Sequence, residues 1–314
     1  MIVCRSQRQK YRTGQRNTEA PAATVAHETP SNPLGDATRF VPDETAAPPS
    51  FATMSAPDQG RGWLAGMVVD GRYEVREVAR GGMAVVSIAF DRELQRMVAV
   101  KTPLPSVLAT EDGRARFQRE AESWIALGVH PNICSAYYLQ EIGGMPRLFI
   151  EYVDGGDLSD WLRQEERPGL EQRFDVAIQI ASGLDYTHTF RWTDDEGVEH
   201  TGIVHRDIKP GNVFITSDGV VKILDFGLAR LAGETRLTKT GTTVGTVMYM
   251  SPEQATGEAV DARSDVWSIG AVLYEMLTGR PPFVGDVDAA VVYQIVNVDP
   301  TPVTSIRGEV PLGI

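Results

Sequence analysis

Cysteine is scarce in this chain of 314 residues, which contains only Cys4 and Cys134. Two cysteines cannot form the disulfide framework of a small secreted domain, so a reducing compartment is expected. Long hydrophobic runs are also missing from the sequence. No stretch approaches the roughly 18 apolar residues of a membrane-spanning helix, and the first residues lack the apolar core of a secretory signal. We therefore expect a cytoplasmic protein without a membrane segment.

Positive charge is in deficit. The 30 Lys and Arg residues stand against 42 Asp and Glu residues, which gives a formal net charge of −12 at pH 7. Because neutralisation of phosphates supplies most of the affinity of proteins for nucleic acids, this balance argues against a nucleic-acid partner. Hydrophobic residues make up 42% of the chain, which is enough to fill a core and excludes disorder of the whole chain.

Large apolar residues are few before about residue 62, where proline, alanine, threonine and serine dominate. Such a segment cannot bury enough surface to offset the entropy of ordering it. Residues 1–62 are therefore predicted to form a disordered Pro/Ala-rich tail. The tip of this tail is basic, which is compatible either with contact to an anionic surface or with simple solvation; its cationic residues are Arg5, Arg8, Lys10, Arg12 and Arg16.

The sequence becomes globular in character from about residue 66. Short alternating or continuous apolar runs predict strands, and apolar residues at helical spacing predict helices. A turn is expected at Gly155-Gly156. The expected strands are 73–78, 85–90, 97–100, 148–153, 213–216 and 220–224, and the expected helices are 111–127, 158–164, 170–188 and 264–277. A β-rich unit followed by a helical unit defines an α+β architecture.

Four short motifs carry the chemical information. The segment 205–212 reads His-Arg-Asp-Ile-Lys-Pro-Gly-Asn, and Asp-Phe-Gly follows at 225–227 after the predicted hairpin. Val-Ala-Val-Lys stands upstream at 98–101 and Ser-Pro-Glu downstream at 251–253. In this order and at these intervals the motifs resemble those of protein kinases. The residues around these motifs are similar to those of the eukaryotic-like Ser/Thr protein kinases of bacteria.

The resemblance implies a two-lobed protein-kinase fold. A small β-rich lobe with one long helix is expected at 63–153, and a larger, mainly helical lobe at 154–314. The implied activity is transfer of the ATP γ-phosphoryl group to Ser or Thr hydroxyls of protein substrates, with Mg²⁺ as the metal. Because the family continues through further helices, the chain, which stops at Ile314, is expected to lack the last helices of the large lobe.

The resemblance also assigns catalytic roles, which fit the needs of phosphoryl transfer. Catalysis of this reaction is mainly positioning and charge stabilisation. Asp207 is expected to accept the proton of the incoming hydroxyl, and Lys209 to reach the γ-phosphoryl oxygens. Asn212 and Asp225 are expected to bind Mg²⁺, a cation that prefers oxygen ligands.

Lys101 lies on an otherwise apolar strand, where an unpaired ammonium is costly. It is expected to contact the α- and β-phosphates of ATP and one carboxylate. The resemblance favours Glu120 as that carboxylate, with Glu122 as the rival on the same helix. Trp124, four residues after Glu120, is predicted to pack inward against Phe226.

The glycine-rich loop departs from the family pattern. The first and third glycines are replaced by Ala79 and Ala84, and only Gly81 and Gly82 keep full backbone freedom. If either alanine had to adopt a left-handed backbone, the cost would be about 1–2 kcal/mol. By resemblance, the remaining nucleotide contacts come from Val86, Ala99, Ile150, Glu151 to Val153, Asp157 and Phe214.

The segment between Asp225 and Glu253 is rich in threonine. A phosphate there can order the loop by pairing with arginine, and Arg206 is the expected partner. The candidate phosphosites are Thr238, Thr240, Thr242 and Thr243. Autophosphorylation at these sites implies possible self-association of the chain. Asp265 is expected either to hydrogen-bond the backbone of the segment 205–212, which resembles the catalytic loop of the family, or to act as an acid at a helix start.

One alternative to an active protein kinase stays open at this stage. A catalytically weak or inactive kinase-fold scaffold is suggested by Ala79 and Ala84 and by the expected lack of the last helices. A small-molecule kinase of related fold is disfavoured, because Thr246 and the Ser-Pro-Glu segment at 251–253 resemble a platform for protein substrates. A longer link than usual at 188–203 is predicted to be a surface insertion, in which Trp192 could contact a partner.

Overall fold

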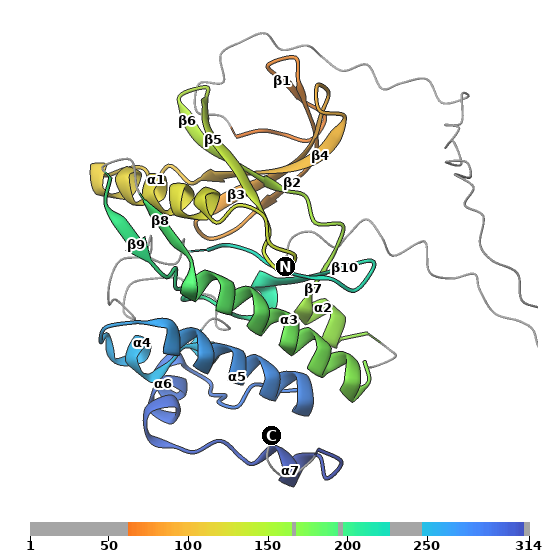
Figure 1. Ribbon diagram of the computed structural model, residues 1–314, viewed down its shortest axis with the longest axis vertical. Helices are drawn as coiled ribbons and strands as arrows, with labels where there is room; N and C mark the ends of the chain where they lie inside the picture. The colour runs from red at the N-terminus through yellow and green to blue at the C-terminus, as the bar shows by residue number, and fades with distance from the viewer. Residues whose placement is uncertain (1–61, 165–167, 194–196, 227–246, 311–314) are drawn as a thin grey trace, which may run out of the picture.

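The computed structural model describes residues 62–164, 168–193, 197–226 and 247–310. A curved sheet with one long helix lies above a mainly helical body, so the described part of the chain has two lobes (Figure 1). The predicted α+β class is thereby confirmed. The predicted tail, apart from Gly62, and all four candidate phosphosites lie outside the described residues.

The small lobe is built on a six-stranded antiparallel sheet with the order β1-β2-β3-β4-β6-β5. The apolar runs of the sequence form these strands because their side chains pack on both faces of the sheet. The predicted strands around 73, 85, 97 and 148 are confirmed. The bounds are β1 Val68–Val69, β2 Tyr73–Arg80, β3 Ala84–Asp91, β4 Arg96–Pro103, β5 Ala136–Ile142 and β6 Met145–Glu151.

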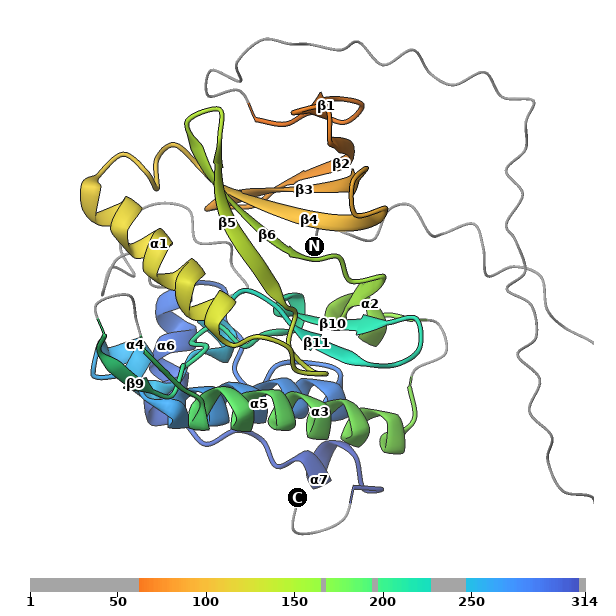
Figure 2. The ribbon, with the colours of Figure 1, turned by 45° about the horizontal axis from the view of Figure 1, so that its top comes forward.

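Helix α1 (Glu111–Ala126) covers one face of this sheet (Figure 2). Thr110 begins the helix, since its side chain accepts a hydrogen bond from the backbone N–H of Gly113 at 3.1 Å. Phe117, Ala121 and Trp124 recur at helical spacing and are buried. Burial of this apolar stripe fixes which side of α1 faces the sheet.

The large lobe centres on two long helices, α3 (Leu170–Thr189) and α5 (Ala262–Thr278), which lie side by side (Figure 2). Gly279 ends α5 with a left-handed backbone, φ 83°, which glycine adopts without strain. The other elements are α2 Leu158–Leu162, η1 Pro210–Asn212, β10 Val213–Thr216, β11 Val221–Ile223, η3 Val247–Tyr249, α4 Pro252–Thr256, α6 Asp288–Asn297 and α7 Val303–Ile306.

The expected turn at Gly155-Gly156 is wrong. These residues belong to the short strand β7 (Gly155–Asp157), which pairs antiparallel with β10. At Gly155 an added Cβ would lie 2.0 Å from the carbonyl oxygen of Ile215. Glycine is needed here because the partner strand approaches closely, and not because the chain turns.

The link between α3 and the catalytic loop is a small hairpin of two strands, β8 (Arg191–Thr193) and β9 (Glu199–Thr201). The half-buried ring of Trp192 stacks on His200, with ring centroids 4.6 Å apart. The predicted insertion therefore has a regular structure at its base, and residues 194–196 lie outside the described part.

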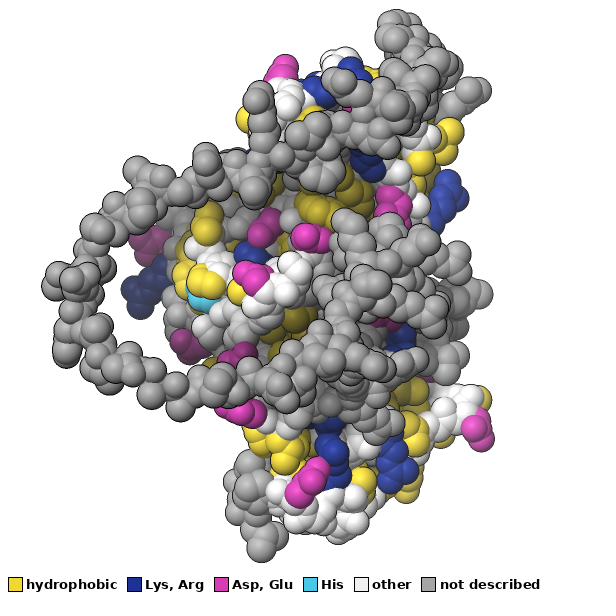
Figure 3. Space-filling view, turned by 90° about the vertical axis from the view of Figure 1, so that its right-hand side faces the viewer, with side chains coloured by type: hydrophobic (Ala, Val, Ile, Leu, Met, Phe, Trp, Pro, Cys, Tyr) yellow, Lys and Arg dark blue, Asp and Glu magenta, His cyan; other side chains and the backbone are white. Residues whose placement is uncertain are grey.

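The surface seen in Figure 3 carries acidic and basic side chains interspersed among hydrophobic ones. Over the described ranges, the structure contains no helix that is long and apolar enough to cross a membrane.

Gly155→Ala should destabilise the fold by about 3 kcal/mol, because the added methyl group collides with backbone atoms of β10. Gly270→Ala is the matched control. An added Cβ at Gly270, inside α5, meets no atom within 4 Å, so that variant should gain about 0.5–1 kcal/mol from helix propensity. Chemical denaturation measures both. Equal stabilities of the two variants would contradict the close approach of β7 and β10.

Candidate active site

The catalytic loop leads from the β8–β9 hairpin to β10, and its polar side chains converge on Asp207. One carboxylate oxygen of Asp207 accepts hydrogen bonds from Lys209 Nζ at 2.6 Å and from Asn212 Nδ2 at 2.9 Å. Asn212 also donates to the carbonyl oxygen of Asp207 at 2.8 Å. Asp207 and Lys209 each expose about a quarter of the side chain, 24%. A half-buried, oriented carboxylate with an ammonium beside it is suited to proton acceptance next to an anionic substrate.

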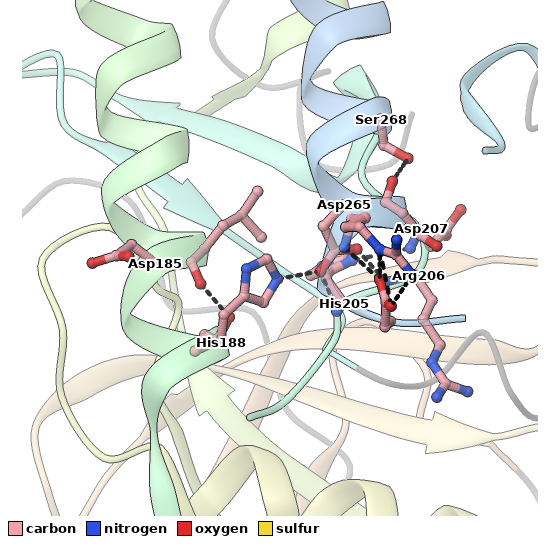
Figure 4. A network of polar contacts seen from close by, with 12 residues as sticks. Asp185, His188, His205, Arg206, Asp207, Asp265 and Ser268 are labelled. Carbon is pink, nitrogen blue, oxygen red and sulfur yellow. Dashed lines mark hydrogen bonds and ion pairs between the residues drawn. The ribbon is translucent and has the colours of Figure 1, made fainter. Parts of the chain in front are cut away.

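Asp265, near the start of α5, holds the backbone of this loop (Figure 4). Its fully buried carboxylate accepts hydrogen bonds from the backbone N–H groups of His205 and Arg206, both at 2.8 Å, and from His188 Nε2 at 2.7 Å. Arg206 has a left-handed backbone, φ 68°, which a non-glycine residue adopts only when its surroundings enforce it. The expected contact of Asp265 with the catalytic loop is confirmed.

The electrostatics of Asp265 follow from these partners. Burial by itself raises the pKa of the carboxyl group, but the hydrogen bond from His188 and those from the loop amides outweigh it. The pKa of Asp265 therefore lies below its ordinary value, and the group is a buried carboxylate at neutral pH.

A stack of rings joins the catalytic loop to the small lobe. His205 packs edge-on against Phe226 with ring centroids 4.7 Å apart, and Phe226 packs against Trp124 of α1 at 6.2 Å. Trp124 donates its indole N–H to the carbonyl oxygen of Cys134 at 2.8 Å. The predicted contact between Trp124 and Phe226 is confirmed.

Lys101 of β4 forms an ion pair with Asp225 at 2.7 Å. The lysine side chain is only 9% exposed. Burial alone raises the pKa of Asp225, but the charge and hydrogen bond of Lys101 outweigh this effect and the pKa is lowered. The backbone N–H of Leu224 donates to the carbonyl oxygen of Asn212 at 2.9 Å, so that Asp225 directly follows a residue bound to the catalytic loop.

The expected pairing of Lys101 with Glu120 is not the one that the structure shows. Glu120 does lie on the buried face of α1, whereas its rival Glu122 is half-buried and accepts a hydrogen bond from Gln118. The carboxylate beside Lys101 is that of Asp225. One carboxylate is enough to offset the burial of this ammonium, and the expectation overlooked that Asp225 could supply it.

Most of the residues expected around the nucleotide lie on strands β3, β4 and β6 of the small lobe and on β7 and β10 of the large lobe. Val86 pairs across the sheet with Lys101, and Ala99 pairs with Ile150. Phe214 of β10 pairs with Asp157, whose side chain caps α2 by accepting a hydrogen bond from Asp160 N at 2.8 Å.

The glycine-rich segment carries no strain at its alanines. Ala79 is a strand residue that pairs with Val86, Ala84 begins β3, and neither has a positive φ. Gly81 donates its N–H to the carbonyl oxygen of Ala84 at 2.8 Å and closes the turn, and an added Cβ at Gly82 would meet no atom within 4 Å. The conditional cost of 1–2 kcal/mol for a left-handed alanine therefore does not arise.

Two contacts near the site were not predicted. Glu151 accepts hydrogen bonds from Ser135 N at 3.0 Å and pairs with Lys222 of β11 at 2.9 Å. His188 was not recognised as a partner of Asp265. The charged side chain of Lys222 within an apolar strand was a signal for a nearby carboxylate. No feature of the sequence around His188 indicates that it would bind a carboxylate.

The comparisons with known proteins agree with this geometry. A family model described as "Protein kinase domain" matches residues 73–305. A probable serine/threonine-protein kinase of Streptomyces coelicolor is 45% identical over 238 residues, which cover 73% of this chain and 33% of that protein. The serine/threonine-protein kinase PknB of Mycobacterium leprae is 40% identical over 237 residues, covering 74% and 36%.

The kinase domain of Mycobacterium tuberculosis PknI has a similar fold, with a TM-score of 0.56 and 24% identity, covering 79% of this chain and 86% of that one. The chain belongs to the protein kinase domain family. It spans about a third of the length of the curated relatives that it matches.

Asp265→Asn should lower the stability at pH 7 by about 3 kcal/mol, because an amide cannot replace a charged acceptor of three hydrogen bonds. The folded-state pKa of Asp265 is depressed. Its contribution is therefore complete above the unfolded pKa near 4 and is lost as the pH falls through the lower folded value.

Denaturation of wild type and variant between pH 3 and pH 7 measures this effect, and the difference between them should shrink toward pH 3. Asp185→Asn, an exposed residue one turn before His188, should change stability by less than about 0.5 kcal/mol. A pH-independent difference for Asp265→Asn would contradict the assignment.

Proposed function

We propose that this chain is an ATP-dependent protein kinase that phosphorylates Ser or Thr hydroxyls of protein substrates. The observation that carries the proposal is the Lys101–Asp225 ion pair. It joins strand β4 of the small lobe to Asp225. Asp225 follows Leu224, whose backbone N–H donates to Asn212 of the catalytic loop. An ammonium, a carboxylate and the Asp207 cluster then border one region between the lobes, as transfer of a γ-phosphoryl group requires.

Each residue of the cluster has a role in this proposal. Asp207 accepts the proton of the substrate hydroxyl, and its hydrogen bonds from Lys209 and Asn212 fix its orientation. Lys209 neutralises charge on the transferred group, and Lys101 contacts the other phosphates once ATP separates it from Asp225. The backbone of 151–153 binds adenine between Ala99 and Phe214, with Asp157 near the ribose.

The donor set fits a magnesium ion. Asp225 offers a carboxylate whose side chain is 37% exposed, and Asn212 offers its amide oxygen, since the amide nitrogen makes the hydrogen bonds to Asp207. Within the described ranges no group of three or more His, Cys, Asp or Glu side chains could hold a metal ion. Two protein oxygens suit Mg²⁺, which takes its remaining ligands from phosphates and water. When bound, the ion would neutralise the charge of the phosphates.

The proposal extends to partners and compartment. Ser/Thr specificity is supported by Lys209 and by the relatives reported above, which are serine/threonine-protein kinases by name. The ordinary strand backbone of Ala79 and Ala84 supports an enzyme over an inactive scaffold. A cytoplasmic location follows from the need for ATP, and the division into lobes at 63–153 and 154–314 is part of the same proposal.

Asp207→Asn and Lys101→Met should each reduce phosphate incorporation from ATP into a protein substrate at least about 100-fold, because they remove the proton acceptor and the phosphate-binding ammonium. Labelled ATP with Mg²⁺ measures transfer, and Asp286→Asn, an exposed carboxylate, is the control that should keep full activity. Activity retained in Asp207→Asn would refute the proposed mechanism.

Autophosphorylation should occur on the threonines at 238, 240, 242 and 243, which lie outside the described residues. Incubation with ATP and Mg²⁺ followed by mass spectrometry should detect phosphate there in the wild type and none in Asp207→Asn. The rate should rise with protein concentration if one copy phosphorylates another. A rate independent of concentration would argue against self-association.

A further inference from the structure

The outer face of the small-lobe sheet, opposite α1, is covered by Trp63. This residue is 2% exposed and stacks on Tyr73, with ring centroids 5.7 Å apart. The guanidinium of Arg147, itself 1% exposed, lies over the Trp63 ring at 4.7 Å. Arg147 donates to the carbonyl oxygen of Ile142 at 3.3 Å and to Thr102 Oγ1 at 3.0 Å. A cation is thus built into a face that the kinase chemistry does not use.

A cavity of about 80 Å³ lies beside this pair, and its lining includes Trp63, Arg80, Ser87, Thr102 and Arg147. Its volume exceeds the roughly 10–15 Å³ that one water needs, so it has room for a group such as carboxylate or phosphate. Among the described residues of the lining, the polar side chains are two guanidiniums, two hydroxyls and an indole N–H, without a carboxylate. The lining therefore presents mainly hydrogen-bond donors and positive charge.

The indole nitrogen of Trp63 is a second, independent sign of a ligand. It is buried and has no hydrogen-bond partner among the residues that the structure describes, and an unsatisfied buried N–H costs about 1–3 kcal/mol. Ser87 and Thr102 are buried as well, at 1% and 6% exposure. An oxyanion suits a cavity lined by such groups, because it accepts several hydrogen bonds and pairs with guanidinium.

The cavity lies on the outer face of the β2–β3 hairpin, whose inner face is assigned to the proposed nucleotide site; we call it the nucleotide-covering hairpin. Successive residues of a strand point to opposite faces. Ser87 and Thr102 line the cavity, whereas their neighbours Val86 and Lys101, which pair with each other, are assigned to the nucleotide. Arg80, which pairs with Val85, closes the β2–β3 turn. One face of these strands is assigned to the nucleotide. A ligand in the cavity would therefore restrain the same strands from the opposite face.

We propose that this cavity binds one oxyanion group, a carboxylate or a phosphate, and that its occupancy tightens the nucleotide-covering hairpin. The second half of this statement rests on the proposed function, whereas the first does not. The shared chemistry has two possible sources, a free anion and a carboxylate of the chain's own segment 1–61, in which Asp58 is four residues from Gly62.

Binding is tested with inorganic phosphate on the full chain. The Lys101→Met background removes the cation of the proposed nucleotide site. Phosphate should raise the melting temperature saturably, by about 3 °C at ten times its dissociation constant. Arg80→Gln should weaken phosphate binding at least fivefold. Arg76→Gln is the matched control, because it removes the same charge from an exposed position of the same strand and should leave binding unchanged.

Thr102→Val is a second variant, which alters the cavity without removing a charge and should also weaken phosphate binding. Equal phosphate effects in all these variants would overturn the proposal, because they would reflect a general salt effect. Saturable binding that depends on Arg80 and Thr102 supports it, and needs no kinase activity to be observed.

Asp58→Asn separates the two sources. If Asp58 occupies the cavity, phosphate should bind this variant at least fivefold more tightly than the parent, whereas an unchanged affinity identifies a free anion as the ligand. Asp43→Asn is the control within the same segment. The coupling is read from the KM for ATP, which phosphate should lower in wild type but not in Arg80→Gln. An unchanged KM in an active wild-type enzyme would overturn the coupling alone.

Discussion

The buried carboxylate of Asp265 is the constraint on which the site depends. It accepts the N–H groups of two consecutive catalytic-loop residues, and it connects them to α5 and, through His188, to α3. Without a full negative charge at this point, the left-handed backbone at Arg206 would lose its main support. The position of Asp207, one residue further on, follows from that backbone. The geometry of the proposed catalytic loop therefore originates in the helical body.

Much of the fold and the central site could be predicted from the sequence, because the motifs are short and their residues act near one another in the chain. The helical spacing of α1 placed Trp124 on the inward face of the helix, and its predicted contact with Phe226 is present. Other contacts between distant segments were not predicted. The partner of Lys101 depends on how two lobes close, and the hydrogen bond between His188 and Asp265 spans 77 positions. Gly155 misled because glycine favours turns and close strand approaches alike.

The two lobes are also tied together by a second set of polar contacts. Lys222, three residues before Asp225, pairs with Glu151 at the end of β6, and Glu151 in turn accepts the N–H of Ser135. The N–H of Cys134 donates to the carbonyl oxygen of Ile223 at 2.9 Å. The segment that precedes β5 is thus bonded to β11, so the residue proposed to bind the metal and the backbone proposed to bind adenine are joined by the same set of contacts.

The base of the β8–β9 hairpin has a practical consequence. Backbone hydrogen bonds of 2.8 Å join Gly202 to Phe190 and Ile203 to Thr187, so the two arms are clamped together before the chain reaches His205. Because these bonds fix the two ends of the hairpin, the number of residues between β8 and β9 should not alter the position of the catalytic loop. Tags, reporter dyes or whole peptide epitopes grafted between the arms should leave the proposed phosphoryl transfer intact, which makes this hairpin a suitable attachment point for a label.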